Sequence, residues 1–309
     1  MHIYTTFNLY SLQGKELNVH IFSETYMEKY FSIFLVLLLS TISNVWSQKS
    51  HLKIVARLPK SINESSGLTA NPDGTFWTHN DSGSKPVIYK IDTLGNILKT
   101  LYLKGATAID YEDISQDIQG NIYVCDCGNN ANNRQNLAIY KISSIDISSG
   151  LDTITPTVIH YHYMDQHLFP PSNDMRNYDC EAMVILNDSI FLFSKNRGKS
   201  MYSKQYALPT APGNYTARLV DSVKTYRWVT GAAISPDNQT LILLSENKLN
   251  IFENFIGSNF FKGHLTKIGI PITQKEGVTF KNNTELYLTD EKYKGFGGKI
   301  YYMNLENKK

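Results

Sequence analysis

One order of residues recurs along most of the chain, and it constrains the fold more than any other feature of the sequence. It is clearest over 62–98, where an acidic residue precedes a short apolar run, a turn lies at 71–74, and two β-rich segments follow. Weaker copies start near Tyr111, Asp179, Thr230 and Lys275. A fixed order of strands that repeats roughly every 45–70 residues is typical of a propeller or a solenoid.

Most copies divide into four short strands, which is the composition of a propeller blade. The last copy supplies only three, whereas the segment Leu52–Leu58 has the composition of a strand and no copy of its own. Because an open sheet edge invites aggregation, we expect Leu52–Leu58 to pair with Lys299–Leu305. The sequence therefore predicts an all-β fold, a single β-propeller of five four-stranded blades closed by the N-terminal strand. Six blades are the alternative, with an extra first strand within 142–177.

The N-terminal region has the features of an export signal. Residues 31–42 form an apolar run that is too short to span a bilayer, with Lys29 before it and Val45-Trp46-Ser47 after it. We interpret 1–26 as an over-extended gene start, 27–47 as a signal peptide and 48–309 as the propeller domain. Since no Cys follows the apolar run, a lipoprotein anchor is not expected. The prediction is a secreted or periplasmic protein with no membrane span after cleavage.

The composition and net charge of the chain limit the kinds of molecule that it is expected to bind. An aromatic content of 12 % favours sheet, and a formal net charge of +2 gives no basis for a nucleic-acid or membrane-surface partner. We expect a monomer that binds a small molecule or a glycan at one mouth of the propeller axis.

In a propeller, the acidic residues of the repeat would gather in one place, where they form a candidate site. The first strand of each blade lines the central channel and starts at the face where the second strand ends. Carboxylates at these two positions should crowd one mouth, where like charges shift one another's pKa unless a cation is present. Oxygen ligands favour Ca²⁺. The predicted metal ligands are Glu64, Asp81, Glu112, Asp126, Glu181, Glu276 and Asp290. The alternative is that each Glu braces the backbone of the neighbouring blade.

Other polar residues at the same mouth are candidates for binding or catalysis. Asn80, Arg134, Lys195 and Asn196 are the predicted ligand-binding residues, although Lys195 is equally suited to neutralising the carboxylates. His79 is the best-placed histidine for general-base chemistry because its ordinary pKa is near neutrality. A lone His at the end of a strand is more often a hydrogen-bonded structural residue. The spacing of His160 and His162 alone is weak evidence for a metal.

The chain has three cysteines, so an exported form permits one intramolecular disulfide at most. Cys125 and Cys127 point to the same side of one strand, and Cys180 begins the first strand of the next blade. We expect either a Cys127–Cys180 disulfide or three buried thiols. The sequence has no CxxC, P-loop, GxSxG or HExxH pattern.

Several motifs resemble those of a family of secreted bacterial propellers of largely unassigned function. They are Glu64–Leu68, Trp77–Gly83, Asp110–Asp113, Asp126–Asn130, Asp179–Ala182 and Val229–Ala232. Tyr111 stands where that family usually has Trp, and Cys180 where it usually has Ala. More distantly the chain is similar to the SdiA-regulated, phytase-esterase-like and SMP-30/gluconolactonase propellers. Several of these hold Ca²⁺ at the axial mouth, so the resemblance implies a Ca²⁺ site but no particular substrate.

Two function classes remain open at the level of the sequence. The first is a Ca²⁺-dependent binding or hydrolytic propeller acting on a small ester, lactone or phosphoester. The second is a non-enzymatic exported scaffold that binds a glycan or a protein. A hydrolase needs a metal with an open coordination position and a base within reach, whereas a scaffold needs only surface complementarity.

Overall fold

The computed structural model describes residues 6–10, 16–20, 52–83, 85–225 and 228–307, and the chain divides into two compact units, Met1–Lys49 and Ser50–Lys309. In the first unit β1 (Thr6–Tyr10) pairs antiparallel with β2 (Glu16–His20). A two-stranded pair thus lies in the stretch that we interpret as an over-extended gene start. The predicted signal peptide at 27–47 lies outside the described residues. Among those that are described, no helix is long and apolar enough to cross a membrane.

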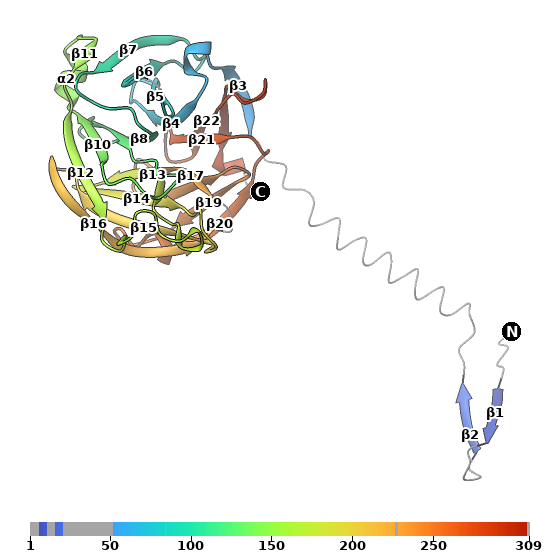
Figure 1. The fold of residues 1–309 in the computed structure, drawn as a ribbon. Coiled ribbons are helices and arrows are strands. Elements are labelled where there is room, and N and C mark those ends of the chain that lie inside the picture. The colour runs from blue at the N-terminus through green and yellow to red at the C-terminus, as the bar shows by residue number, and fades with distance from the viewer. Residues whose placement is uncertain (1–5, 11–15, 21–51, 84, 226–227, 308–309) are drawn as a thin grey trace. The chain divides into compact units, whose positions relative to one another are not determined.

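The second unit is all-β and propeller-like, and its four-stranded sheets follow one another along the chain (Figure 1). The first sheet contains β4 (Ser65–Ala70), β5 (Phe76–Asn80), β6 (Val87–Ile91) and β7 (Ile97–Leu103). The second contains β8 (Tyr111–Gln116), β9 (Ile122–Asp126), β10 (Leu137–Ile142) and β12 (Thr157–Tyr163). The third contains β13 (Asp179–Leu186), β14 (Ser189–Lys195), β15 (Tyr202–Pro209) and β16 (Gly213–Lys224).

The last two sheets complete the unit. The fourth contains β17 (Val229–Ile234), β18 (Thr240–Ser245), β19 (Lys248–Glu253) and β20 (His264–Gly269). The fifth contains β21 (Lys275–Phe280), β22 (Glu285–Asp290), β23 (Lys299–Asn304) and β3 (Lys53–Arg57). Strand β3 pairs antiparallel with β23, Lys299 opposite Arg57 and Tyr301 opposite Ile54. The predicted pairing of Leu52–Leu58 with Lys299–Leu305 is therefore present.

Shorter elements lie between these sheets. The α-helix α2 (Ser144–Ser148) and the two-residue strand β11 (Thr153–Ile154) connect β10 to β12, and β11 pairs parallel with β7. Strands β12 and β16 also pair in parallel, which joins the outer edges of the second and third sheets. The 3-10 helices are η1 (Lys60–Ile62), η2 (Asn173–Met175), η3 (Phe260–Lys262) and η4 (Leu305–Asn307).

Burial along the strands follows from their position in each sheet. The outermost strand β12 alternates, with Ile159, Tyr161 and Tyr163 buried and His160 and His162 exposed, because one face packs and the other meets solvent. The innermost strand β13 is buried along its whole length, since both of its faces meet protein. His160 and His162 thus lie on a solvent-exposed face.

The innermost strands are neighbours in a closed cycle. Strand β4 contacts β8, β8 contacts β13, β13 contacts β17, β17 contacts β21, and β21 contacts β4. In Figure 1 these strands gather around the centre of the second unit, with the remaining strands of each sheet outside them. The buried hydrophobic residues form separate clusters, one between each pair of neighbouring sheets. Sheet-on-sheet packing therefore holds the unit together, and the starts of the inner strands meet at one end of the axis.

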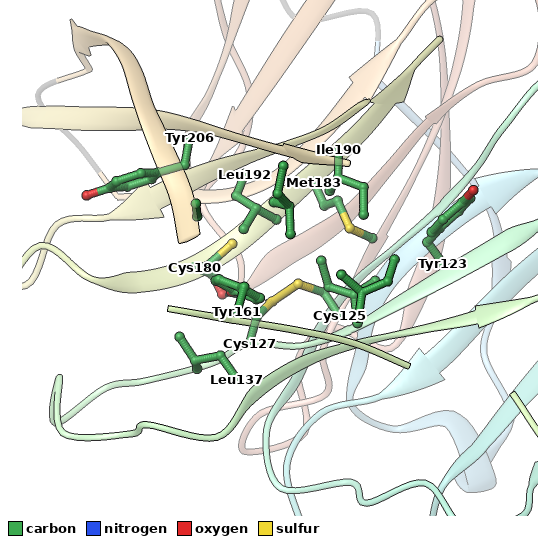
Figure 2. Close-up of a cluster of buried hydrophobic side chains, with 14 of the residues drawn as sticks. Tyr123, Cys125, Cys127, Leu137, Tyr161, Cys180, Met183, Ile190, Leu192 and Tyr206 are labelled. Atoms are coloured by element: carbon green, nitrogen blue, oxygen red, sulfur yellow. Dashed lines mark hydrogen bonds between the residues drawn. A yellow bond between two sulfur atoms is a disulfide. The ribbon is translucent and has the colours of Figure 1, made fainter. Parts of the chain in front are cut away.

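The cysteines lie between the second and third sheets (Figure 2). Cys125 and Cys127 form a disulfide, whereas Cys180 is free and buried. Both the predicted Cys127–Cys180 pair and the alternative of three thiols are wrong. Residues two apart on a strand direct their side chains to one face, and the turn after β9 brings these Cα atoms to 5.1 Å, within the range that a disulfide requires.

Candidate functional site

Every inner strand carries one extra residue relative to the second strand of its sheet. In β8, for example, Tyr111 pairs with Asp126 and Asp113 with Cys125, so Glu112 has no partner. The unpaired residues are Ser66, Glu112, Glu181, Thr230 and Glu276. Such a β-bulge re-aims a side chain, and bulges are over-represented beside active sites. We call these five the bulge residues.

One predicted metal ligand, Glu64, does not lie at a bulge. Glu64 precedes β4 and is exposed, and the bulge position of that strand holds Ser66. The hydroxyl of Ser66 donates to the backbone oxygen of Glu112 at 2.9 Å and to Oε2 of Glu276 at 3.2 Å. Glu64 is thus two residues out of register with the other glutamates. Its backbone oxygen accepts a hydrogen bond from the N–H of Asp81.

The other glutamates belong to a continuous cluster of carboxyl groups, which we call the acidic mouth. Three overlapping groups each place one ligand atom per residue within 4.8 Å of one another. They are Asp81 with Asp110 and Glu112, Asp81 with Glu276 and Glu291, and Glu112 with Asp179 and Glu181. The structure thus brings together the predicted Asp81, Glu112, Glu181 and Glu276. Sequence reasoning missed Asp110, Asp179 and Glu291.

Burial and crowding raise the proton affinity of these groups. Burial first, and then Glu181 and Asp81, raise the pKa of Glu112 well above its ordinary value. The pKa values of Glu181 and Glu276 are raised in the same way, chiefly by burial. Burial raises the pKa of Asp110 to about 6 and that of Glu291 to about 7, with neighbouring carboxylates adding to both. The acidic mouth therefore favours bound protons or a bound cation over free carboxylates.

Two cations offset part of this charge. Lys195 Nζ lies 2.6 Å from Glu181 Oε2, and Arg197 lies 2.6 Å from Asp179 Oδ2 through Nε and 3.0 Å from Glu181 Oε1 through Nη2. Burial by itself lowers the pKa of Lys195, but Glu181 and its neighbours raise it above the ordinary value. In the part of the chain that the structure describes, no ion pair reaches the acidic mouth from another residue. Carboxyl groups thus outnumber cations.

A glycine makes the closest part of the acidic mouth possible. A Cβ on Gly128 would overlap Oε1 of Glu112 and Oδ2 of Asp110. The N–H of Gly128 donates to the backbone oxygen of Asp110 at 3.1 Å. These two carboxylates therefore lie against bare backbone, and any larger residue at 128 would displace them.

Two further predicted ligands lie outside the acidic mouth. Asp126 is fully buried and binds Arg134 at 2.9 Å, the N–H of Asp110 at 3.0 Å and the hydroxyl of Thr107 at 2.8 Å. Asp290 is also fully buried and accepts from the N–H of Lys299 at 2.8 Å and the hydroxyl of Tyr301 at 2.6 Å. The structure corrects the predicted metal set here, because these two carboxylates make their bonds within their own sheets.

His79 is not at the mouth surface, contrary to the prediction. The side chain is fully buried, and its ring packs edge-on against Tyr111 with centroids 5.6 Å apart. Nδ1 lies 3.0 Å from the backbone oxygen of Asn80, while Nε2 has no partner among the described residues. Burial lowers the pKa of His79 to about 4, so the imidazole is neutral at pH 7 and has no access to solvent.

The predicted ligand-binding residues mostly hold loops. Asn80 donates to the backbone oxygen of Ser61 at 2.8 Å, and Arg134 donates to the backbone oxygen of Gly128 at 2.6 Å. Lys195 neutralises Glu181, which is one of the two roles predicted for it. Asn196 accepts from the N–H of Gly198 at 2.8 Å and lines a pocket on the rim.

A different surface lies at the opposite end of the inner strands. A cavity of about 480 Å³ is lined there by residues from the ends of all five inner strands, among them Leu68, Ile114, Ile185, Ala232 and Val278. This lining also includes polar residues such as Gln116 and Asn187, and it carries none of the acidic-mouth residues. The concentration of charge is thus confined to the end where the inner strands begin.

No family model and no curated protein matches the sequence. Among solved structures, the PQQ-bound form of an aldose sugar dehydrogenase from Streptomyces coelicolor is similar, with 11 % identity, a TM-score of 0.46 and coverage of 84 % of this chain and 99 % of that one. A gluconolactonase from Xanthomonas campestris has 15 % identity and a TM-score of 0.44, covering 83 % and 90 %. A streptogramin B lyase has 15 % identity and a TM-score of 0.41, covering 78 % and 80 %.

Proposed function

We propose that this chain is an exported five-bladed β-propeller, closed by β3, that binds Ca²⁺ at the acidic mouth. The closed cycle of inner strands and the pairing of β3 with β23 support five blades and closure. The stretch 142–177, where a sixth first strand would fall, contains α2, β11, β12 and η2. The observation that carries the cation site is the cluster of buried carboxyl groups, with Glu112, Glu181 and Glu276 at bulges, which Lys195 and Arg197 only partly neutralise.

The donor set fits a hard divalent cation. Ca²⁺ takes oxygen ligands in flexible geometry, and carboxylates serve as mono- or bidentate ligands. Asp81 follows β5, whereas Asp110 and Glu112 lie at the start of β8, and the three carboxyl groups converge without an ion pair from the described residues. As anions, three carboxyl groups without an ion-pair partner among the described residues are costly in a partly buried site unless they hold protons or a cation.

The same site is suited to hydrolysis of a small ester, lactone or phosphoester. A bound cation would polarise the carbonyl or phosphoryl oxygen of the substrate. Glu291 replaces His79 as the candidate base, because its pKa of about 7 matches neutral pH. Its carboxyl group lies in the acidic mouth with Asp81 and Glu276, and its Oε2 accepts from Gln274 Nε2 at 3.2 Å.

Calorimetric titration of the purified protein with Ca²⁺ tests the cation site. We expect saturable binding in the wild type and in Glu306→Gln, an exposed control outside the acidic mouth, and weaker binding in Glu112→Gln. Equal affinity in all three proteins would reject the site. A panel of esters, lactones and phosphoesters then tests hydrolysis. Ca²⁺ binding without turnover would favour the alternative function, a non-enzymatic scaffold that binds a glycan or a protein.

Removal of the chain through Pro59 tests closure. Without β3, the edge of β23 is unpaired and its apolar face is partly exposed. We expect the free energy of unfolding to fall by several kcal/mol, at ~25 cal/mol per Å² of apolar burial lost. An unchanged melting temperature would contradict the closed ring. Export is tested by N-terminal sequencing of protein from the periplasm or medium, which should begin at Gln48.

A further inference from the structure

A second concave site lies beside the acidic mouth. It is a pocket of about 300 Å³ between the third and fourth sheets, lined by Asn196, Ser200, Met201, Trp228 and Glu246 among others. Its first three residues come from the connection between β14 and β15, Trp228 directly precedes β17, and Glu246 follows β18. We call it the rim pocket. None of these five residues belongs to the acidic mouth.

An exposed tryptophan forms one wall of the rim pocket. Trp228 retains 44 % of its surface, which is unusual for so large an aromatic side chain. Arg197 lies 4.8 Å from its ring centroid and Lys195 lies 5.6 Å from it. Since Glu181 fixes both cations, the indole is supported by side chains that are themselves held in place. A rigid, half-exposed aromatic surface is suited to packing against a ring of a ligand.

Glu246, a carboxylate for which the described residues provide no partner, lies in the same pocket. Among the described residues, Glu246 takes part in no hydrogen bond or ion pair, although it is partly buried. The hydroxyl of Ser200 accepts from the N–H of Tyr202 at 3.1 Å, so its proton remains available for donation. The rim pocket therefore offers a strong acceptor and a donor next to the indole.

We propose that the rim pocket binds one sugar ring of a neutral saccharide. The C–H face of the ring would pack on Trp228, and its hydroxyls would donate to Glu246 and accept from Ser200. A volume of about 300 Å³ is at the lower end for small-molecule sites, which suits one or two rings. The inference goes beyond the cation proposal, because no residue of the rim pocket needs a metal.

The charges around the pocket argue against ionic ligands. A cation on Trp228 would meet repulsion from Arg197 and Lys195, which already lie against the ring, and from Lys199 on the pocket wall. An anion would meet Glu246, which no described cation neutralises. A neutral ligand with several hydroxyl groups avoids both penalties while satisfying the free carboxylate.

Calorimetry of the purified protein provides the test. The probes are neutral trisaccharides of glucose, mannose, galactose and N-acetylglucosamine, with choline and glucuronate as ionic probes. We expect at least one neutral trisaccharide to bind, roughly tenfold or more weaker binding in Trp228→Ala, and several-fold weaker binding in Glu246→Gln. Trp228→Phe, which keeps an aromatic ring, should lose less. Tyr293→Ala, an exposed aromatic outside the pocket, is the matched control and should bind as the wild type does.

Intrinsic fluorescence gives a second readout. Trp77 is buried, so a saccharide-induced change in emission that is present in the wild type and absent in Trp228→Phe locates the ligand at Trp228. Binding should persist in chelator, which separates this proposal from the Ca²⁺ site. The proposal is overturned if no neutral saccharide binds, if Trp228→Ala with a normal melting temperature binds equally well, if choline or glucuronate binds more tightly, or if chelator abolishes binding.

Discussion

Two sets of buried carboxylates occupy repeated positions in this fold, yet their surroundings differ. Asp126 and Asp290 end second strands, and each is surrounded by donors from its own sheet, such as Arg134 and Tyr301. Glu112 lies at a bulge and faces other carboxylates. Burial of a carboxylate is therefore not by itself a functional signal. The presence or absence of donors within the same sheet separates a structural acid from a binding one.

The difference arises from the direction in which each side chain points. A residue at the end of a second strand can reach the loop before the first strand and the loop before the third, and both supply N–H groups and side-chain donors. A bulge residue leaves the ladder of its sheet and turns towards the axis, where the inner strands of other sheets bring similar residues. The second and fifth sheets therefore satisfy their own strand-end acids. Among the bulge acids, Glu181 pairs with Lys195 and Arg197 of its own sheet, whereas Glu112 and Glu276 lie against other carboxyl groups.

The largest expected change in the free energy of unfolding comes from Asp126, one of the two carboxylates that are satisfied within their own sheets. Asp126→Asn removes the charge that balances the mostly buried Arg134 and weakens an acceptor of several donors. We expect the free energy of unfolding to fall by roughly 3 kcal/mol, the scale of breaking a buried ion pair. Chemical denaturation of Asp126→Asn beside Asp146→Asn, an exposed control, measures it. A loss no larger than that of the control would abolish the distinction between the two sets.

In contrast to Asp126→Asn, Glu112→Gln should not lower the stability of the apo protein. The change keeps an oxygen ligand and removes one of several crowded charges, so the apo protein should be as stable as the wild type or more stable, while Ca²⁺ affinity falls about tenfold. Thermal melts in chelator and in added Ca²⁺ measure both effects. If Glu112 is instead a strut between sheets, the apo protein should lose roughly 1–3 kcal/mol. Equal shifts of the melting temperature on adding Ca²⁺ to both proteins would remove Glu112 from the ligand set.

The acidic mouth should make the stability of the protein depend on pH. In the folded protein the pKa of Asp110 is raised from 3.8 to about 6 and that of Glu291 from 4.5 to about 7. The folded state then binds more protons than the unfolded state between these limits, so stability falls as pH rises from about 4 to about 7. We expect this decline in chelator and a smaller one in saturating Ca²⁺. Denaturation curves across this range measure the slope, and a rising apo stability would contradict the raised pKa values.

The smallest expected effect comes from the glycine behind the acidic mouth. Gly128→Ala places a methyl group where Glu112 and Asp110 now lie, so these carboxylates must shift. We expect Ca²⁺ affinity to fall several-fold with little change in melting temperature, because the displaced side chains face the axis and not a hydrophobic core. Calorimetry with Gly269→Ala, an open position without positive φ, controls for the added methyl group. Unchanged affinity in Gly128→Ala would place the cation elsewhere in the cluster.

The sequence predicts the strands well and the site only in part. The repeated apolar segments predict four short strands in most copies, as observed, because local side-chain burial determines where strands form. The position of a bulge residue does not follow from the residues of one strand, because it depends on how that strand pairs with its neighbour. For that reason the exposed Glu64 is assigned in place of Ser66, and the donors that satisfy Asp126 and Asp290 are not anticipated.

The missed carboxylates had a signal in the sequence. Asp110, Asp179 and Glu291 each lie within two residues of a predicted ligand, in the acidic runs 110–113, 179–181 and 290–291. Asp110 with Glu112, and Asp179 with Glu181, are each two residues apart, and both pairs reach the acidic mouth across a bulge. The sequence did not indicate a role for Trp228, because its ring lies against Arg197 and Lys195, which belong to another sheet.

The pairing of β3 with β23 has a consequence for the order in which the protein can be completed. A ribosome makes Lys53–Arg57 well before the partner Lys299–Asn304. Until Lys299–Asn304 is made, β3 has no sheet to join, and the first inner strand lacks its neighbour β21. Pairings between such distant segments form slowly. Completion of the fold must therefore follow synthesis of β23, and a chain interrupted before β23 would leave β3 and β22 with unpaired edges.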